Sequence, residues 1–192
     1  TDNFTTQEEG EQYLYNAWCA LTVVQALGLD VNKAASYIKD FGALDGRGKH
    51  HNLKIHDGHY TLIDDSYSGQ PEAMKLGIEA LDKTHTAGRK IVVLGKMAEL
   101  GDTSKARHIE IGKQLANSSI DVVVGVCPEM KDMLAQLPVE KQQYYFENKD
   151  QVADFLLNKL LQNNDTVLIK GARYSSKLYQ VTEELLKNGS AA

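Results

Sequence analysis

The chain has 192 residues, of which 42% are hydrophobic, and its formal net charge is −5. That length can bury the core of one ordinary domain and part of a second. The mixed, mildly acidic charge excludes the clustered Lys and Arg of a nucleic-acid interface. The longest apolar runs, such as Ile91 to Leu94 and Val122 to Val126, are far shorter than the ~20 residues that span a bilayer. We therefore expect a soluble globular protein with neither a nucleic-acid nor a membrane partner.

Two further features predict a cytoplasmic protein. The first residues, Thr1 to Glu11, are polar and acidic, unlike a secretory signal. The two cysteines, Cys19 and Cys127, fall within a predicted helix and after a predicted strand, which suits reduced thiols better than a disulfide framework.

The N-terminal part is predicted to be helical. Apolar residues recur at helical spacing from Glu11 to Leu27, and Gly28 follows at the position where a helix often ends in a left-handed residue. A second, shorter helix is expected from Val31 to about Phe41. The glycine-rich, basic connector Gly42 to Lys49 cannot continue that helix, and it exposes Arg47 between two glycines.

The next segment predicts a hairpin that leads to an acidic strand end. Asn52 to Asp57 and His59 to Ile63 have the pattern of strands around Asp57-Gly58, a pair that accepts positive φ. The second strand runs into Asp64 and Asp65, and a polar turn then leads to a helix. In an open α/β sheet this is the crevice where ligands bind, so the carboxylates are candidates for ligand or magnesium binding. Locally, a simple strand end explains them equally well.

The rest of the chain alternates between strands and helices. The strands are unbroken runs of Val, Ile and Leu, which favours a mostly parallel sheet covered on both faces. The predicted strands are Ile91 to Gly95, Asp121 to Val126, Gln143 to Phe146 and Thr166 to Lys170, and the predicted helices are Pro71 to Lys83, Ser104 to Asn117, Pro128 to Gln136, Lys149 to Gln162 and Ser175 to Lys187. The predicted fold class is therefore α/β, a doubly wound, Rossmann-like domain with right-handed crossovers.

The predicted elements also suggest a domain boundary. Before Asp57 there are two helices without a sheet of their own, which is too little to fold alone. We therefore predict that residues 1–57 are a short helical tail of a preceding domain, together with the start of the hairpin, and that residues 58–192 are the α/β domain.

Two more loops after predicted strands carry charged residues. Gly95 to Gly101 follows a buried strand and leads to a helix that carries His108. In the other loop Lys170 ends a strand, a glycine lets the backbone turn, and Arg173 stands at the start of the next helix, where cations and free N–H groups attract anions.

Several familiar sites are missing from the sequence. There is no Gly-x-x-x-x-Gly-Lys-Ser/Thr phosphate loop and no Gly-x-Gly-x-x-Gly fingerprint, so the chain carries no complete nucleotide site of these kinds. No Gly-x-Ser-x-Gly elbow indicates a serine nucleophile. The histidines His50, His51, His56 and His59 alternate along a hairpin and do not have metal-ligand spacing.

Taken together, these motifs resemble the C-terminal domain of the Mur ligases. The motifs are Asp64-Asp65-Ser66-Tyr67, then Val-Leu-Gly-x-Met-x-Glu-Leu-Gly from Val93, then His108, and finally Lys170-Gly171-Ala172-Arg173. Upstream, Gly10 to Ala17 is similar to the segment that ends the family's central ATPase domain, and Asp45 to Gly48 is similar to its Gly-Arg motif before the domain hinge. The resemblance covers essentially the whole chain.

The resemblance implies a function and roles for single residues. The family consists of ATP-dependent amide ligases, which in peptidoglycan precursor synthesis join an amino acid or dipeptide to the carboxylate of a UDP-sugar peptide through an acyl phosphate. Asn16 would contact the adenine, Arg47 the phosphates, and Asp65 the ribose, with Tyr67 near the base. The carboxylate of the acceptor, a D-amino acid or dipeptide, would bind to the cations of the last motif, Lys170 and Arg173.

By the same resemblance, this chain is a C-terminal piece without catalytic residues of its own and inactive alone. The phosphate loop lies in the central domain, so ATP and Mg²⁺ would be bound mainly by central and N-terminal domains outside the chain. Lys96 stands where the family has Asp, which leaves room for a ligase that acts on a carboxylate outside peptidoglycan. A non-catalytic ligand-binding module is a further alternative. A receiver-like signalling domain is disfavoured, because it needs a phosphoacceptor aspartate at the end of a central strand, and the strands Ile91 to Gly95 and Asp121 to Val126 end in glycine and valine.

Overall fold

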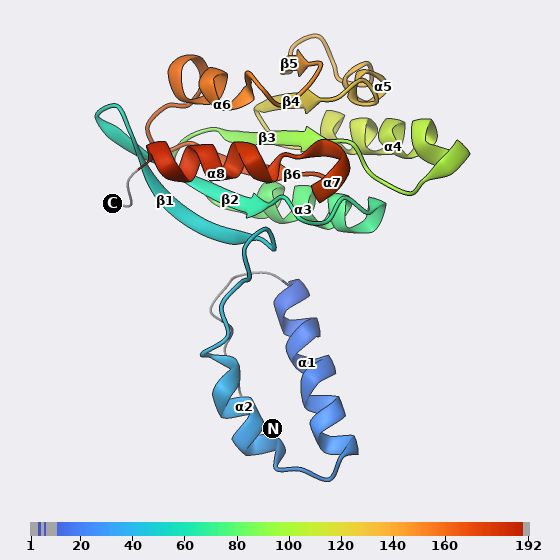
Figure 1. The fold of residues 1–192 in the computed structure, drawn as a ribbon, viewed down its shortest axis with the longest axis vertical. Helices are drawn as coiled ribbons and strands as arrows, with labels where there is room; N and C mark the ends of the chain where they lie inside the picture. The colour runs from blue at the N-terminus through green and yellow to red at the C-terminus, as the bar shows by residue number, and fades with distance from the viewer. Residues whose placement is uncertain (1–3, 5, 7–10, 190–192) are drawn as a thin grey trace. The chain divides into compact units, whose positions relative to one another are not determined.

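The chain divides into two compact units, Thr1–Leu44 and Asp45–Ala192. The computed structural model describes residue 4, residue 6 and residues 11–189 (Figure 1). Among these described residues, no helix is long and apolar enough to cross a membrane.

The first unit contains two helices, α1 (Glu11–Ala26) and α2 (Val31–Ile38). Gly28, with φ +69°, turns the chain between them, and the side chain of Asp30 caps α2 by accepting a hydrogen bond from Lys33 N at 3.0 Å. Large apolar side chains of this unit are exposed, among them Trp18 at 58% and Phe41 at 77%. The two helices therefore enclose little core of their own.

The second unit is built on a six-stranded sheet with the order β1-β2-β6-β3-β4-β5. Its strands are β1 (Lys49–Ile55), β2 (Gly58–Asp65), β3 (Lys90–Gly95), β4 (Val122–Val126), β5 (Gln142–Phe146) and β6 (Thr166–Lys170). All neighbouring strands are parallel except β1 and β2, which form an antiparallel hairpin. The prediction of a doubly wound, mostly parallel sheet is confirmed.

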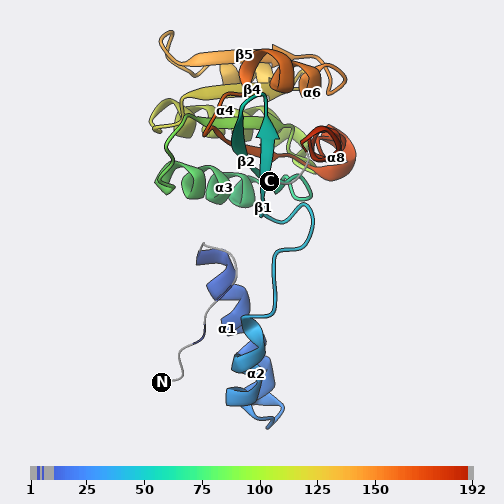
Figure 2. The ribbon, with the colours of Figure 1, turned by 90° about the vertical axis from the view of Figure 1, so that its left-hand side faces the viewer.

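Helices cover both faces of this sheet. On one face lie α3 (Pro71–Lys83), α4 (Ser104–Ala116) and α5 (Met130–Leu134), and on the other lie α6 (Val152–Phe155), its π-helical continuation Leu156–Leu160 and α8 (Tyr179–Asn188). Figure 2 shows α3 and α8 on opposite sides of the strands. Two short helical turns, Gly101–Thr103 and α7 (Arg173–Ser176), lie in loops after β3 and β6.

The two cores follow from the alternation of side chains along the strands. In β4, Val122, Val124 and Val126 belong to the core under α6 and α8, whereas Val123 belongs to the core under α3, α4 and α5. Every residue of β4 and β6 is buried. This explains why these strands are apolar without interruption.

The hairpin differs in detail from the prediction. Its loop is His56–Asp57, and Gly58 is already the first residue of β2. Among His56, Asp57 and Gly58, the residue with a positive φ is His56, at 46°. Gly58 is required for a different reason, since a Cβ there would lie 2.3 Å from the side-chain oxygen of Asn163.

Strand β1 also begins earlier than predicted, at Lys49, and ends earlier, at Ile55, because its polar first residues pair with β2 from Lys49↔Asp64 onward. The compact unit that contains the sheet consequently begins at Asp45, ahead of β1.

The last predicted helix is interrupted. Lys177 adopts a left-handed conformation, with φ 55°, and ends α7 before α8 begins. This break fixes the direction in which α8 leaves the carboxyl end of β6.

Candidate functional site

The carboxyl ends of the parallel strands meet at one edge of the sheet, where an α/β fold places its ligands. Strands β2 and β6 are in register there, with Asp65 opposite Lys170. Because β1 is antiparallel to β2, its first residue, Lys49, lies opposite Asp64. The loop Asp45 to Gly48 therefore reaches the same edge as the ends of β2, β6 and β3 (Figure 1).

A buried ion pair occupies the centre of this edge. Lys170 Nζ lies 2.5 Å from Asp65 Oδ2, and the side chains are 2% and 19% exposed, respectively. Burial raises the pKa of the Asp65 carboxyl above its usual value, and the Lys170 ammonium opposes this shift. Gly77 of α3 lets the helix pack against the lysine, since a Cβ there would lie 3.0 Å from Lys170 Cδ. The ammonium is thus directed at Asp65 and is shielded from solvent.

The neighbouring carboxylate, Asp64, holds backbone in place. Its Oδ2 accepts a hydrogen bond from Gly46 N at 2.9 Å, and its Oδ1 accepts from Ser66 N at 3.2 Å and Ser66 Oγ at 2.6 Å. Its carbonyl oxygen accepts from Gly48 N at 2.7 Å. Asp64 therefore joins the loop around Arg47 to the turn after β2. Consecutive strand residues point to opposite faces, which is why the two adjacent aspartates have different partners.

Four side chains near this edge form an alternating series of rings and guanidinium groups, here called the Tyr–Arg stack. Arg47 Cζ lies 4.2 Å from the centre of the Tyr67 ring, and Arg173 Cζ lies 5.6 Å from the same ring. Arg173 Cζ is also 4.2 Å from the centre of the Tyr179 ring. The backbone supports this arrangement, since Arg173 N donates to Tyr67 O at 3.2 Å. The stack thus joins three segments that are distant in sequence.

The loop after β3 is held by a second set of contacts. Lys96 Nζ forms an ion pair with Glu129 Oε1 at 2.9 Å. The buried ring of His108 accepts a hydrogen bond from Met97 N through Nε2 at 3.1 Å, and its Nδ1 lies 2.7 Å from Ser104 O. These partners require the proton on Nδ1, so His108 is a structural bridge between the loop and α4.

Comparison with known proteins identifies the family. The family described as "Mur ligase, glutamate ligase domain" matches residues 51–173. The chain belongs to the Mur ligase family.

The relatives agree with this assignment. The UDP-N-acetylmuramoyl-tripeptide–D-alanyl-D-alanine ligase of Rickettsia prowazekii is 29% identical over 153 residues, which cover 80% of this chain and 33% of the relative. The ligase of the same name from Bacillus subtilis is 27% identical, over 93% of this chain and 39% of the relative. The chain therefore spans about a third of the length of the relatives that it matches.

Solved structures of MurF share the fold. A crystal structure of MurF from Acinetobacter baumannii has a TM-score of 0.81 at 23% identity, covering 96% of this chain and 40% of that one. The MurF ligase from Thermotoga maritima, in complex with ADP, has a TM-score of 0.65 at 27% identity, covering 87% of this chain and 35% of that one. The predicted resemblance to a Mur ligase C-terminal domain is confirmed.

Within this Mur ligase domain, most of the predicted site residues converge. Arg47, Asp65, Tyr67, Lys170 and Arg173 all lie at the carboxyl edge of the sheet. Lys170 contacts Asp65 directly, although the two were expected to serve different ligands. The ring of Tyr67 contacts both guanidinium groups.

The remaining predicted residue, Asn16, is an exposed residue of α1 in the Thr1–Leu44 unit. Gly10, at the start of the same motif, lies outside the described residues. Tyr179 is the residue of the stack that sequence reasoning missed, because a tyrosine at the start of a predicted amphipathic helix gives no signal of its own.

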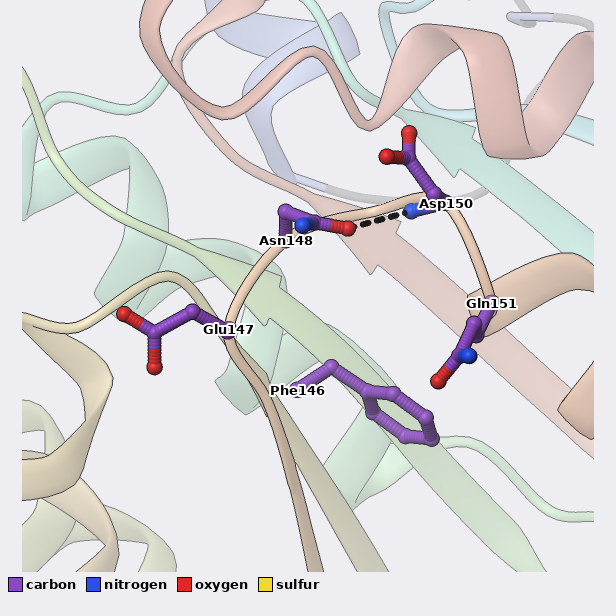
Figure 3. Close-up of a pocket in the computed structure, with 5 residues that line it drawn as sticks. All are labelled: Phe146, Glu147, Asn148, Asp150 and Gln151. Atoms are coloured by element: carbon purple, nitrogen blue, oxygen red, sulfur yellow. Dashed lines mark hydrogen bonds between the residues drawn. The ribbon is translucent and has the colours of Figure 1, made fainter.

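A separate hollow of the Mur ligase domain follows β5, the edge strand of the sheet. It is lined by Phe146, Glu147, Asn148, Asp150 and Gln151 (Figure 3). Asn148 Oδ1 accepts a hydrogen bond from Asp150 N at 2.9 Å, which shapes the loop. None of these lining residues is a predicted site residue, and in the strand order β3 and β4 separate β5 from β6.

Proposed function

We propose that the chain is the C-terminal part of an ATP-dependent Mur-type ligase that joins a D-amino acid or dipeptide to the carboxylate of a UDP-muramoyl peptide in peptidoglycan precursor synthesis. The observation that carries the proposal is the convergence of Arg47, Asp65, Tyr67, Lys170 and Arg173 on one edge of the sheet. The relatives are named as UDP-N-acetylmuramoyl-tripeptide–D-alanyl-D-alanine ligases, which supports this substrate class. The location that fits such precursors is the cytoplasm.

The residues of the sheet unit fit parts of ATP. In the proposed reaction the γ-phosphoryl group of ATP activates the donor carboxylate as an acyl phosphate, and the acceptor amine displaces phosphate to form the amide. The Asp65 carboxylate offers oxygens that accept hydrogen bonds from ribose hydroxyls, while the ion pair with Lys170 holds it in place and opposes the rise of its pKa on burial. Arg47, an exposed residue that contacts the Tyr67 ring, suits phosphate oxygens. Asn16, from the other unit, is proposed for the adenine.

The chain's own residues do not complete the reaction in this proposal. Among the described residues, no three His, Cys, Asp or Glu side chains group as a metal site. Mg²⁺ would therefore take its ligands from ATP and from central and N-terminal domains that precede residue 1 in a longer protein. Residues 1–57 are proposed to be the end of the central domain and the start of the hairpin.

The longer protein and the chain are expected to differ completely in activity. Full-length protein supplied with ATP, Mg²⁺, UDP-N-acetylmuramoyl-tripeptide and D-alanyl-D-alanine should release ADP and form the ligated product, measured by coupled ADP assay and mass spectrometry. Thr1–Ala192 alone should show no turnover, because the sequence has no phosphate loop. ATP hydrolysis by Thr1–Ala192 would contradict the proposal, and so would a full-length protein that ligates none of the offered amines.

Replacing Arg173 tests the acceptor site. In the full-length enzyme, Arg173→Ala should raise the KM for the acceptor by on the order of tenfold to a hundredfold, because a charge-assisted pair with the acceptor carboxylate is lost. The KM for ATP should change by less than about threefold. An acceptor KM equal to that of the wild type would remove Arg173 from the acceptor site.

A Mur-type ligase for a different carboxylate is a second candidate, and Lys96 is the observation that favours it. Lys96 stands where the family pattern has Asp, and Glu129 compensates its charge at 2.9 Å. A panel of carboxylate donors and amine acceptors, offered to the full-length enzyme, separates the two candidates by their kcat/KM values. A non-catalytic binding module would bind such ligands without releasing ADP.

A further inference from the structure

Arg173 contacts two aromatic rings that come from different elements. Its Cζ lies 4.2 Å from the centre of the Tyr179 ring, at the start of α8, and 5.6 Å from the centre of the Tyr67 ring, in the turn after β2. The backbone bond from Arg173 N to Tyr67 O, at 3.2 Å, fixes the base of the same side chain. The guanidinium is therefore constrained at both its base and its planar end.

Arg173 and the nearby Lys170 differ in whether a carboxylate neutralises their charge. The lysine is paired with Asp65 at 2.5 Å. Among the described residues, no carboxylate lies within ion-pair distance of Arg173. Contact with a ring face stabilises a cation without neutralising it or using its N–H donors along the edge of the guanidinium plane. The stack thus presents a fixed positive charge with donors available for an anion.

We infer that Tyr179 and Tyr67 are positioning residues, which hold the Arg173 guanidinium in the orientation that receives the carboxylate of the amine acceptor. This inference rests on the proposed function and adds to it the residues that orient the acceptor contact. A flexible arginine would lose its freedom on each binding event, whereas a clamped one has lost it already. The clamp should therefore act on acceptor affinity and leave the chemical step unchanged.

Of the two rings, Tyr179 allows the cleaner test. Tyr67 also contacts Arg47, so a substitution there affects two guanidinium groups at once. The ring of Tyr179 contacts Arg173, and its hydroxyl accepts a hydrogen bond from Gln180 Nε2 at 3.1 Å. Tyr179→Phe keeps the ring and removes only that hydroxyl bond, whereas Tyr179→Leu keeps an apolar side chain and removes the ring.

The first experiment is steady-state kinetics on the full-length enzyme. Tyr179→Leu should raise the acceptor KM by roughly tenfold, the size of one cation–π contact, with kcat and the KM for ATP within about twofold of the wild type. Tyr179→Phe should keep the acceptor KM within about twofold of the wild type. Tyr174→Leu is the matched control, because Tyr174 is 83% exposed, and it should leave all three parameters unchanged.

The second experiment needs no turnover. In Thr1–Ala192, ring currents from Tyr179 should shift the NMR signal of Arg173 Nε–Hε, and the shift should persist in Tyr179→Phe and disappear in Tyr179→Leu. An unshifted signal in the wild type overturns the clamp, as does an acceptor KM that Tyr179→Leu leaves unchanged or that Phe and Leu raise equally. If the shift is present but the full-length enzyme ligates no acceptor, the proposed function fails, and with it the role of the clamp in acceptor binding.

Discussion

Lys170→Met is expected to lower the free energy of unfolding of the sheet unit by about 3 kcal/mol, because it leaves the Asp65 carboxylate buried without its counter-ion. Methionine fills most of the space of the lysine stem, so packing against Gly77 of α3 is largely kept. Asp65 is 19% exposed, which places the effect at the lower end of the range for broken buried pairs. Urea unfolding of Thr1–Ala192, followed by far-ultraviolet circular dichroism, measures the change.

Two comparisons make this result specific. Lys113→Met removes an exposed lysine of α4 and should change the free energy of unfolding by less than about 0.5 kcal/mol. Adding Asp65→Leu to Lys170→Met removes the stranded charge and should recover much of the loss, which a double-mutant cycle would detect. A single Lys170→Met variant as stable as the wild type would show that the ion pair contributes nothing to folding.

Gly69→Ala is expected to lower kcat/KM of the full-length enzyme by on the order of a hundredfold, because it misplaces both sides of the proposed site together. A Cβ at residue 69 would lie 2.3 Å from the backbone nitrogen of Ala172. The turn that carries Tyr67 and the loop that carries Arg173 must then move apart, and the bond from Arg173 N to Tyr67 O is lost. We expect the KM values for ATP and for the acceptor to rise together.

The control for this prediction lies in the same turn. Ser68→Ala removes a hydroxyl without adding a Cβ, and its kinetic parameters should stay within about threefold of the wild type. If Gly69→Ala raised only one of the two KM values, the close contact between the turn and the loop would not couple the two ligands.

The fold could be predicted from the sequence because its strands are buried on both faces. Val122 to Val126 and Thr166 to Lys170 have no polar alternation, and only a covered parallel sheet explains such runs. The start of strand β1 was missed because Lys49 to His51 are polar, and their pairing depends on Asp64 and its neighbours in β2. The left-handed Lys177 could not be foreseen, since lysine has no preference for that conformation.

The site was predicted only as far as single motifs allow. The family pattern indicated Asp65 and Lys170, but it did not show that they form one ion pair, since that follows from the register of β2 and β6. Likewise, nothing local distinguishes Asp64, which holds backbone, from Asp65. The Tyr–Arg stack depends on how Tyr67 and Tyr179 approach through the tertiary fold, which no spacing rule encodes.

The position of β6 also constrains how the molecule can be made. This strand is the last of the six in sequence, yet it lies between β2 and β3, and Asp65 and Lys170 are separated by 105 positions along the chain. As the chain emerges from the ribosome, the β1–β2 hairpin and the β3–β4–β5 segment cannot pair into one sheet until β6, Thr166–Lys170, has been made, because β6 pairs with both β2 and β3. Contacts over such long loops close slowly, and unpaired strand edges favour aggregation. Strand β6, which ends in Lys170, is therefore also the strand that must be synthesised before the sheet can be completed.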